Sequence, residues 1–323
     1  LTRPLGAATQ LTLHSAKEMS PAWSPDGRKL AFISTRSDPN GDLYVMELPD
    51  RLERGAAEVL EREVKRYTSL ETADGEPTWS RSGDAIVFSA SPPGPGGQNL
   101  WRLDLNSGAR VQLTSRGGFS PRCSPDGQYV LFTSTRDDPG GDIWVLRLSD
   151  LAEARITGGP ALDGFGDWAL DGRSIVFTRY ADDTNGDGRL STEDNASLWR
   201  VPFRLEVFSG LEELPAATPL TSGATYDIFP VAGEGMIIYV TNRRGAFNLW
   251  RLEPEGLLPR QATLEEQVEL ASRLASESTA DHHLAILAYR TALAAFGSSR
   301  QLDLLARCQY GIGEQYLELR NWW

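Results

Sequence analysis

One pattern of hydrophobic and polar positions recurs five times along the chain. Each unit has a small polar turn, a continuous apolar triplet that ends in an aromatic residue, a polar loop, and a second apolar segment centred on an aromatic residue. The triplets end in Phe32, Phe88, Phe132, Phe177 and Tyr239. The intervals between these residues are 56, 44, 45 and 62 positions. A repeat of about 40 to 50 residues, lengthened twice by insertions, predicts a propeller or a solenoid.

The apolar triplets predict strands that are buried on both faces, because they are continuous and do not alternate with polar residues. The next strand of each unit is predicted at residues 42–45, 99–102, 142–145, 197–200 and 248–251. An outer strand ends in a threonine, namely Thr12, Thr68, Thr114, Thr157, Thr221 and Thr263. Five four-stranded blades are therefore predicted, with one outer strand too many at residues 10–12. Either its blade begins upstream of residue 1, or it docks on another blade and closes the ring.

The turns and the tryptophans have structural interpretations. Four turns carry an aspartate next to a glycine. This pair suits a tight turn, because the Asp side chain accepts hydrogen bonds from nearby backbone and Gly accepts positive φ. A tryptophan precedes most of these turns, at Trp23, Trp79 and Trp168, and Cys123 takes that position in the third unit. Aromatic residues at repeat spacing usually fill a core. We assign the turn aspartates no catalytic role.

The segment Pro21-Ala22-Trp23-Ser24-Pro25-Asp26-Gly27, with the strand residues that follow it to Val45, resembles the WD-like repeat of TolB-like β-propellers. The resemblance covers about residues 8–263, and the third unit repeats it closely. It implies four-stranded blades, usually six, in a periplasmic or cell-envelope protein that binds other proteins through a face of the propeller. We expect an all-β propeller over residues 1–263.

The period changes to a helical one over residues 264–323. Three helix starts are predicted near Thr263, Ser278 and Ser298, each with an acidic residue or Gln three positions later. The spacing of Ala285, Tyr289 and later apolar residues resembles a tetratricopeptide repeat. We expect a small all-α domain of tetratricopeptide-like helices that the sequence truncates, or alternatively a plain helical cap on the propeller.

A calcium loop is predicted at residues 183–194, in the insertion of the fourth unit. Oxygen-bearing side chains and a backbone carbonyl fall at the positions that calcium loops use, and Gly188 takes the position where such a loop turns. The predicted ligands are Asp183, Asn185, Asp187, the carbonyl of Arg189, Ser191 and Asp194. Asp in place of Glu at the last position resembles dockerin-type loops. The alternative is a polar turn in an exposed insertion.

The composition and charge of the chain limit the classes of partner that it can bind. A net charge of −12 disfavours nucleic acid and anionic membranes, which would repel the chain. No apolar stretch is long enough to span a bilayer. The two cysteines, Cys123 and Cys308, give no disulfide framework. Acidic loop residues of the first and third units, namely Asp38, Asn40, Asp42, Asp138 and Asp142, are hairpin turns that could also form an acidic rim on one face.

No hydrolytic machinery is recognisable in the sequence. The histidines are His14, His282 and His283, and none adjoins a plausible nucleophile. We therefore expect a non-enzymatic scaffold of the bacterial cell envelope, periplasmic or extracellular, that binds other proteins and is stabilised by one calcium ion. The alternative is the non-catalytic gating propeller of a larger prolyl oligopeptidase-like peptidase. A propeller enzyme acting on sugars or polyuronates is a third hypothesis, which the scarcity of histidine disfavours.

Overall fold

The computed structural model describes residues 10–49, 56–69, 72–91, 97–210, 213–233 and 235–254. The chain divides into two compact units, Leu1–Leu258 and Pro259–Trp323, and all described residues belong to the first. The predicted outer strand ending at Thr263 and the predicted tetratricopeptide-like helices of residues 264–323 lie outside the described residues.

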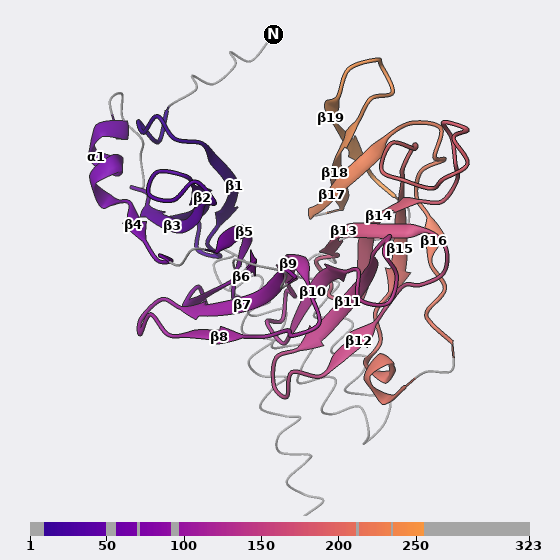
Figure 1. Ribbon diagram of the computed structural model, residues 1–323, viewed down its shortest axis with the longest axis horizontal. Coiled ribbons are helices and arrows are strands. Elements are labelled where there is room, and N and C mark those ends of the chain that lie inside the picture. Colours follow the sequence, from indigo (N-terminus) through magenta and orange to yellow (C-terminus); the bar gives the residue numbers. More distant parts are fainter. Residues whose placement is uncertain are drawn as a thin grey trace, which may run out of the picture. The chain divides into compact units, whose positions relative to one another are not determined.

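The described residues form five antiparallel sheets, which follow one another in chain order (Figure 1). Blade 1 contains β1 (Glu18–Trp23), β2 (Lys29–Ser34), β3 (Asp42–Glu47) and β4 (Lys65–Arg66). Blade 2 contains β5 (Ala73–Trp79), β6 (Ala85–Ser91), β7 (Asn99–Asp104) and β8 (Arg110–Gln112). Blade 3 contains β9 (Phe119–Cys123), β10 (Tyr129–Ser134), β11 (Asp142–Arg147) and β12 (Glu153–Arg155).

Blade 4 contains β13 (Leu162–Trp168), β14 (Ser174–Tyr180), β15 (Ser197–Pro202) and β16 (Thr218–Pro219). Blade 5 contains β17 (Asp227–Gly233), β18 (Met236–Thr241) and β19 (Asn248–Leu252), which are its three described strands. The insertion between β3 and β4 holds helix α1 (Ala56–Glu63), whose Leu60 is buried. A short 3₁₀ helix, η1 (Leu205–Ser209), follows β15. The all-β propeller of repeated blades is thus confirmed for these residues.

The aromatic residues that define the repeat are cross-strand partners. In every blade the aromatic residue of the second strand lies opposite the aromatic residue of the third. The pairs are Phe32 with Tyr44, Phe88 with Trp101, Phe132 with Trp144, Phe177 with Trp199, and Tyr239 with Trp250. Such facing pairs stabilise a sheet and fix its register.

An arginine stacks on this aromatic pair in four of the blades. The guanidinium carbon of Arg179 lies 5.3 Å from the ring centre of Phe177 and 4.7 Å from that of Trp199. Arg36, Arg136 and Arg243 lie over the corresponding rings of blades 1, 3 and 5. The same arginines form ion pairs, for example Arg179 with Asp163 at 2.7 Å. Each arginine therefore stabilises its blade in two ways, by an ion pair with a carboxylate and by stacking on the aromatic pair.

The predicted closing threonines bind the strand beside them. Thr68 Oγ1 accepts a hydrogen bond from the amide of Leu43 at 2.8 Å, and Thr114, Thr157 and Thr221 do the same for Leu100, Ile143 and Leu198. The turn glycines also behave as predicted, since Gly27, Gly83, Gly127, Gly172 and Gly235 all have φ between 67° and 74°.

Contacts between blades run in chain order from β1 through β5, β9 and β13 to β17. Among the described strands, no comparable contact joins blade 5 to blade 1. The side chains at these two edges are accordingly exposed. Leu249 is 74% exposed, whereas its equivalents Leu43, Leu100, Ile143 and Leu198 are 0% exposed. Trp23 is 59% exposed, against 6% for Trp79 and 3% for Trp168.

The surplus segment at residues 10–12 is not a strand in the structure. Leu11 packs against Leu30, Phe32, Tyr44 and Met46 of blade 1. In the other blades this place is taken by the residue that directly follows the outer strand of the preceding blade, namely Tyr67, Leu113, Ile156 and Leu220. Leu11 thus occupies, on blade 1, the position of an outer strand of a neighbouring blade.

Candidate functional site

The first strand of every blade carries a β-bulge at the same place. The register with the second strand shifts there in all five sheets. One residue in each bulge has a left-handed backbone, with φ between 49° and 53°: Ser20, Glu76, Ser120, Phe165 and Phe229. Non-glycine residues seldom adopt this conformation, and bulges are often found where a strand redirects a side chain towards a site.

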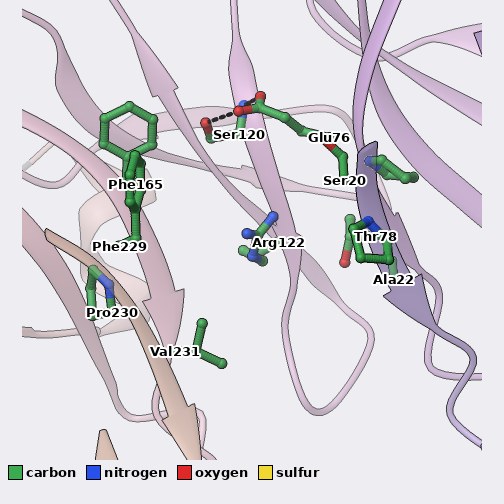
Figure 2. Close-up of a pocket in the computed structure, with 12 residues that line it drawn as sticks. Ser20, Ala22, Glu76, Thr78, Ser120, Arg122, Phe165, Phe229, Pro230 and Val231 are labelled. Atoms are coloured by element: carbon green, nitrogen blue, oxygen red, sulfur yellow. Dashed lines mark hydrogen bonds between the residues drawn. The ribbon is translucent and has the colours of Figure 1, made fainter. Parts of the chain in front are cut away.

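These bulges surround one pocket, which has a volume of about 390 Å³. A pocket of this size lies within the range of small-ligand and peptide sites. Its lining comes from β1, β5, β9, β13 and β17, and consists of the bulge residues with the one or two residues after them (Figure 2). The position two after the bulge is Ala22, Thr78, Arg122, Asp167 and Val231 in the five blades. Five equivalent backbone positions therefore present five different side chains.

Glu76 and Ser120 join blades 2 and 3 at the wall of the pocket. The Glu76 carboxylate accepts a hydrogen bond from the Ser120 amide at 2.6 Å and another from the Ser120 hydroxyl at 2.8 Å. Both carboxylate oxygens are thus engaged, and the negative charge of Glu76 is held by the neighbouring strand. A carboxylate that is fixed in this way is poorly placed to act as a general base.

Arg122 supplies a positive charge at the pocket. Its Nη1 donates to the carbonyl oxygen of Pro121 at 2.9 Å, and among the described residues no carboxylate lies within ion-pair distance of it. Asp167, on the next blade, interacts electrostatically with Arg122. Burial raises the pKa of Asp167, while Arg122 and the amides of Ala232 and Trp168 lower it.

Phe165 and Phe229 form the apolar side of the pocket. Their ring centres are 4.6 Å apart and the rings meet edge to face at 76°. Phe229 is 46% exposed and Val231 is 54% exposed. Figure 2 shows this aromatic pair on one side of Arg122, with Ser20, Thr78 and Ala22 on the other. The pocket thus combines one cationic group with an accessible apolar wall.

The predicted calcium loop lies between β14 and β15. Asp183 accepts hydrogen bonds from the amides of Gly186 at 2.7 Å and Gly188 at 2.8 Å, and Gly188 has φ of 81°. Asn185 and Asp187 accept from the amides two residues later, and both are exposed. Arg189 is also exposed, and Ser191 is partly buried.

Asp194 differs from the other predicted ligands because its carboxylate is buried within the loop. It accepts hydrogen bonds from the amides of Thr184, Asn185 and Ser191, at 2.7, 3.1 and 2.9 Å. These amides lower the pKa of Asp194. Among the described residues, no group of three or more His, Cys, Asp or Glu side chains is gathered as a metal site. The Asp194 carboxylate therefore connects the two ends of the loop by hydrogen bonds.

The acidic rim expected in the loops of blades 1 and 3 does not form as predicted. Asp42 and Asp142 are 0% exposed, and they pair with Arg66 at 2.7 Å and Arg155 at 2.6 Å. Asp38 and Asp138 remain at the surface as turn residues, each accepting the amide two residues later. The hairpin interpretation therefore holds for Asp38, Asn40 and Asp138, whereas Asp42 and Asp142 begin the strands β3 and β11. Burial of these two aspartates could not be read from the loop sequence, because the arginines that pair with them lie on the outer strands.

Sequence analysis missed the pocket residues. Glu76, Arg122 and Phe229 precede the repeat tryptophan or its equivalent by one to three positions, and none belongs to a recognised motif. The signal that could have revealed them is variation, because the bulge position holds Ser, Glu or Phe and the position two residues later differs in every unit, while their neighbours in the repeat are similar. Cys123 lies next to the pocket, and burial raises the pKa of its thiol to about 12, so it stays protonated.

His14 lies outside the pocket and its Nδ1 accepts the amide of Ala16, while His282 and His283 lie outside the described residues. Nowhere in the described part of the chain is there a helix with the length and apolar character needed to cross a membrane.

No known protein-family profile matches the chain. The chain is 26% identical over 170 residues to an uncharacterised protein of Agrobacterium fabrum, covering 49% of this chain and 53% of that protein. It is 35% identical over 131 residues to the TolB homologue of Chlorobium chlorochromatii, covering 39% of this chain and 26% of the homologue. It is also 33% identical over 86 residues to the uncharacterised peptidase YuxL of Bacillus subtilis, covering 27% and 11%. The chain thus spans about half the length of the first relative and less of the others.

Solved structures show the same fold at low sequence identity. TolB of Acinetobacter baumannii matches with a TM-score of 0.56 and 21% identity, over 75% of this chain and 53% of that one. A putative TolB of Agrobacterium tumefaciens gives 0.56 and 19%, over 74% and 78%. A puromycin-hydrolysing peptidase of Mycobacterium tuberculosis gives 0.52 and 14%, over 75% and 37%. The described residues therefore form a TolB-like β-propeller, a fold that propeller domains of peptidases share.

Proposed function

We propose that this propeller is a non-enzymatic scaffold that binds other proteins at the pocket formed by its five first strands. The observation that carries the proposal is that all five blades contribute a bulged residue to one site, and that these residues are serine, glutamate or phenylalanine. Multiple strands supply a rigid rim, and rigid sites lose little entropy when they bind. The structures of TolB from Acinetobacter baumannii and of the putative TolB from Agrobacterium tumefaciens, which share the fold, support the scaffold proposal by analogy.

The chemistry of the pocket supports binding better than catalysis. Glu76 has both carboxylate oxygens engaged by Ser120, and the Cys123 thiol is protonated. The pocket hydroxyls belong to Ser20, Thr78 and Ser120, and the lining contains no imidazole that could activate them. A nucleophile and its base within hydrogen-bond reach are the usual signature of covalent catalysis.

A photo-crosslinking experiment tests the proposal. The full chain would carry p-benzoylphenylalanine in place of Val231 in the pocket, or in place of Arg173 on an exposed turn as the control. Both would be irradiated in the envelope fraction of the source cells. We expect a discrete crosslinked protein from the Val231 variant and none from the Arg173 variant. Equal crosslinking patterns from both positions would contradict a pocket-directed scaffold.

The gating propeller of a larger peptidase is the second candidate. The likeness to the YuxL peptidase and to the puromycin-hydrolysing peptidase favours it. A fluorophosphonate probe, which labels activated serines, separates the two proposals. Labelling of the native gene product, together with a Gly-x-Ser-x-Gly motif in the gene, would favour the peptidase. An unlabelled native product that still crosslinks through Val231 would favour the scaffold.

We place the protein in the periplasm or cell envelope of a bacterium, in line with its TolB-like fold. We include residues 264–323, for which the sequence predicts helices, as a second surface for protein partners. Cell fractionation of an epitope-tagged native gene product tests the location. Recovery in the cytosolic fraction would contradict it.

We also propose that the loop at residues 183–194 binds one structural calcium ion. The side chains of Asp183, Asn185 and Asp187 alternate along a tight turn, with the Arg189 carbonyl and Ser191 next to them, as calcium loops require. Asp194 would contribute only if a metal displaced some of the amides that it now accepts. Asp183 and Asp187 are therefore the ligands whose replacement is most informative.

Differential scanning calorimetry with calcium or chelator tests the calcium proposal. Calcium should raise the melting temperature of the wild-type chain and leave that of an Asp183→Ala, Asp187→Ala variant unchanged. The Asp182→Ala variant, altered next to the loop, serves as the control and should respond like the wild type. The same response in all three chains would rule out this site.

A further inference from the structure

The available polar groups of the pocket are hydrogen-bond donors. Arg122 uses one N–H group on the Pro121 carbonyl and has no ion pair among the described residues. The Thr78 hydroxyl is engaged by Cys123, because its oxygen accepts the Cys123 amide at 3.4 Å and its O–H is within reach of the Cys123 sulfur. The carboxylate of Glu76 is held by Ser120. A ligand in this pocket therefore meets donors first and must supply acceptors.

A carboxylate is the acceptor that fits these donors best. The planar guanidinium of arginine binds a carboxylate through two parallel hydrogen bonds, and charge-assisted bonds of this kind are stronger than neutral ones. A group with several negative charges fits less well, because Glu76 and Asp167 lie close to Arg122 and would repel the additional charge. The ligand should carry one carboxylate.

The rest of the ligand should be apolar. Phe229 and Val231 expose 46% and 54% of their surface, and Phe165 and Pro230 continue this wall. Arg122 lines the same pocket of about 390 Å³ as this wall, and Figure 2 shows the wall on one side of it. The carboxylate and the apolar group of the ligand must therefore be close together. The C-terminal residue of a peptide meets this demand, because its carboxylate and its side chain leave the same carbon atom.

We propose that the pocket binds the C-terminus of a partner protein that ends in a large apolar residue, with the terminal carboxylate on Arg122 and the side chain against Phe229 and Val231. The volume of about 390 Å³ suits the last two or three residues of such a peptide. This inference rests on the proposed protein-binding function and specifies the part of the partner that enters the pocket.

Fluorescence anisotropy with three short labelled peptides tests the inference on the full chain. The first is Gly-Ser-Gly-Ser-Phe with a free C-terminus, the second is the same peptide as its C-terminal amide, and the third is Gly-Ser-Gly-Glu-Phe amide. We expect the free acid to bind at least about 10-fold more tightly than either amide, as expected for loss of a charge-assisted hydrogen bond. Equal affinity of the acid and its amide would overturn the proposal, and tightest binding of the Glu peptide would assign the site to a side-chain carboxylate instead.

Variants of the chain check that binding occurs at this pocket. Arg122→Gln should lower the affinity for the free-acid peptide about 10-fold or more. Arg122→Lys should lower it less, since the charge remains and only the second hydrogen bond is lost. Arg173→Gln, on an exposed turn, should have no effect. Phe229→Ala, at a half-exposed position in the pocket wall, should also weaken binding. Unchanged affinity in both Arg122→Gln and Phe229→Ala would contradict the proposal.

The outcomes of this test are separable from those of the crosslinking test. A Val231 crosslink together with equal affinity for acid and amide peptides would retain the scaffold and reject the C-terminal carboxylate. Loss of the crosslink after Arg122→Gln, with the circular dichroism spectrum unchanged, would support both.

Discussion

The indole Nε1 of Trp168 donates a hydrogen bond of 3.0 Å to the carbonyl oxygen of Arg122, across the junction between blades 4 and 3. Trp79 makes the same bond to Ala22 at 2.9 Å between blades 2 and 1. The repeat tryptophan therefore fastens the backbone of the pocket strand on the preceding blade. This explains why tryptophan recurs immediately after the variable pocket position.

We predict that Trp168→Phe lowers the free energy of unfolding by about 1 to 3 kcal/mol, because it leaves the Arg122 carbonyl without its partner and removes buried ring surface. Trp23→Phe should change it by less than about 0.5 kcal/mol, since Trp23 is 59% exposed. Urea unfolding followed by circular dichroism measures both. Similar losses for the two variants would show that Trp23 is covered in the whole protein.

The equivalent leucines of the third strands give a second pair of predictions. Leu198→Ala should cost about 2 to 5 kcal/mol, because Leu198 is 0% exposed between blades 4 and 5. Leu249→Ala should cost less than about 1 kcal/mol, because Leu249 is 74% exposed at the edge of blade 5. Chemical denaturation of the full chain measures the free energy of unfolding of both variants. A loss at Leu249 as large as that at Leu198 would mean that another part of the polypeptide covers this edge.

Asp142 makes the stability dependent on pH. Burial raises the pKa of Asp142 to about 6, against the opposing attraction of Arg155 and with help from Asp163 and Asp138. The folded state then holds this proton more tightly than the unfolded state, whose carboxyl titrates near its ordinary value of 3.8. The contribution of Asp142 to stability is therefore full below about pH 4 and is lost as the pH rises through about 6.

The Asp142→Asn variant should lack this component. Unfolding free energies of the wild type and the variant are to be measured at several pH values between 4 and 7, with the exposed Asp137→Asn variant as control. The difference between wild type and Asp142→Asn should change across this interval, and the difference for Asp137→Asn should stay nearly constant. A constant difference for Asp142→Asn would contradict the raised pKa.

The Asp194 carboxylate should keep the inserted loop in its folded conformation even without calcium. Its carboxylate accepts amides from both ends of the loop, so Asp194→Ala leaves three amide groups without their partner. We expect limited proteolysis to cut within residues 181–196 several times faster in this variant, in the presence of chelator. Asp182→Ala should be cut at the wild-type rate. Equal rates in all chains would show that the loop is ordered by other contacts.

The blades were predictable from the sequence because the repeat records their packing directly. Phe88 and Trp101 recur at fixed spacing, and they are cross-strand partners within a buried sheet. The turn of blade 5 is eroded at residue 234, yet Gly235 still has the left-handed φ that the pattern predicts. Helix α1 was not predicted, because its short amphipathic segment lies inside an insertion that has no counterpart in the other units.

The pocket was not predictable in the same way. A repeat reveals what is constant, whereas the pocket is built from the positions that vary between Ala22, Thr78, Arg122 and Val231. The burial of Asp42 was also hidden, since it depends on Arg66, which lies 24 positions away on an outer strand. The left-handed backbone at Glu76 and Phe229 carries no residue signature, because Ser, Glu and Phe all occur at the bulge.

The five bulges share one backbone conformation while they accept Ser, Glu or Phe at the same place. Folding thus constrains the chain at these sites but does not dictate which side chain they bear. Single replacements there can change what the pocket attracts while the sheets, turns and blade contacts remain as they are. A lineage of such propellers could acquire new partners one residue at a time, and each intermediate would remain a folded protein.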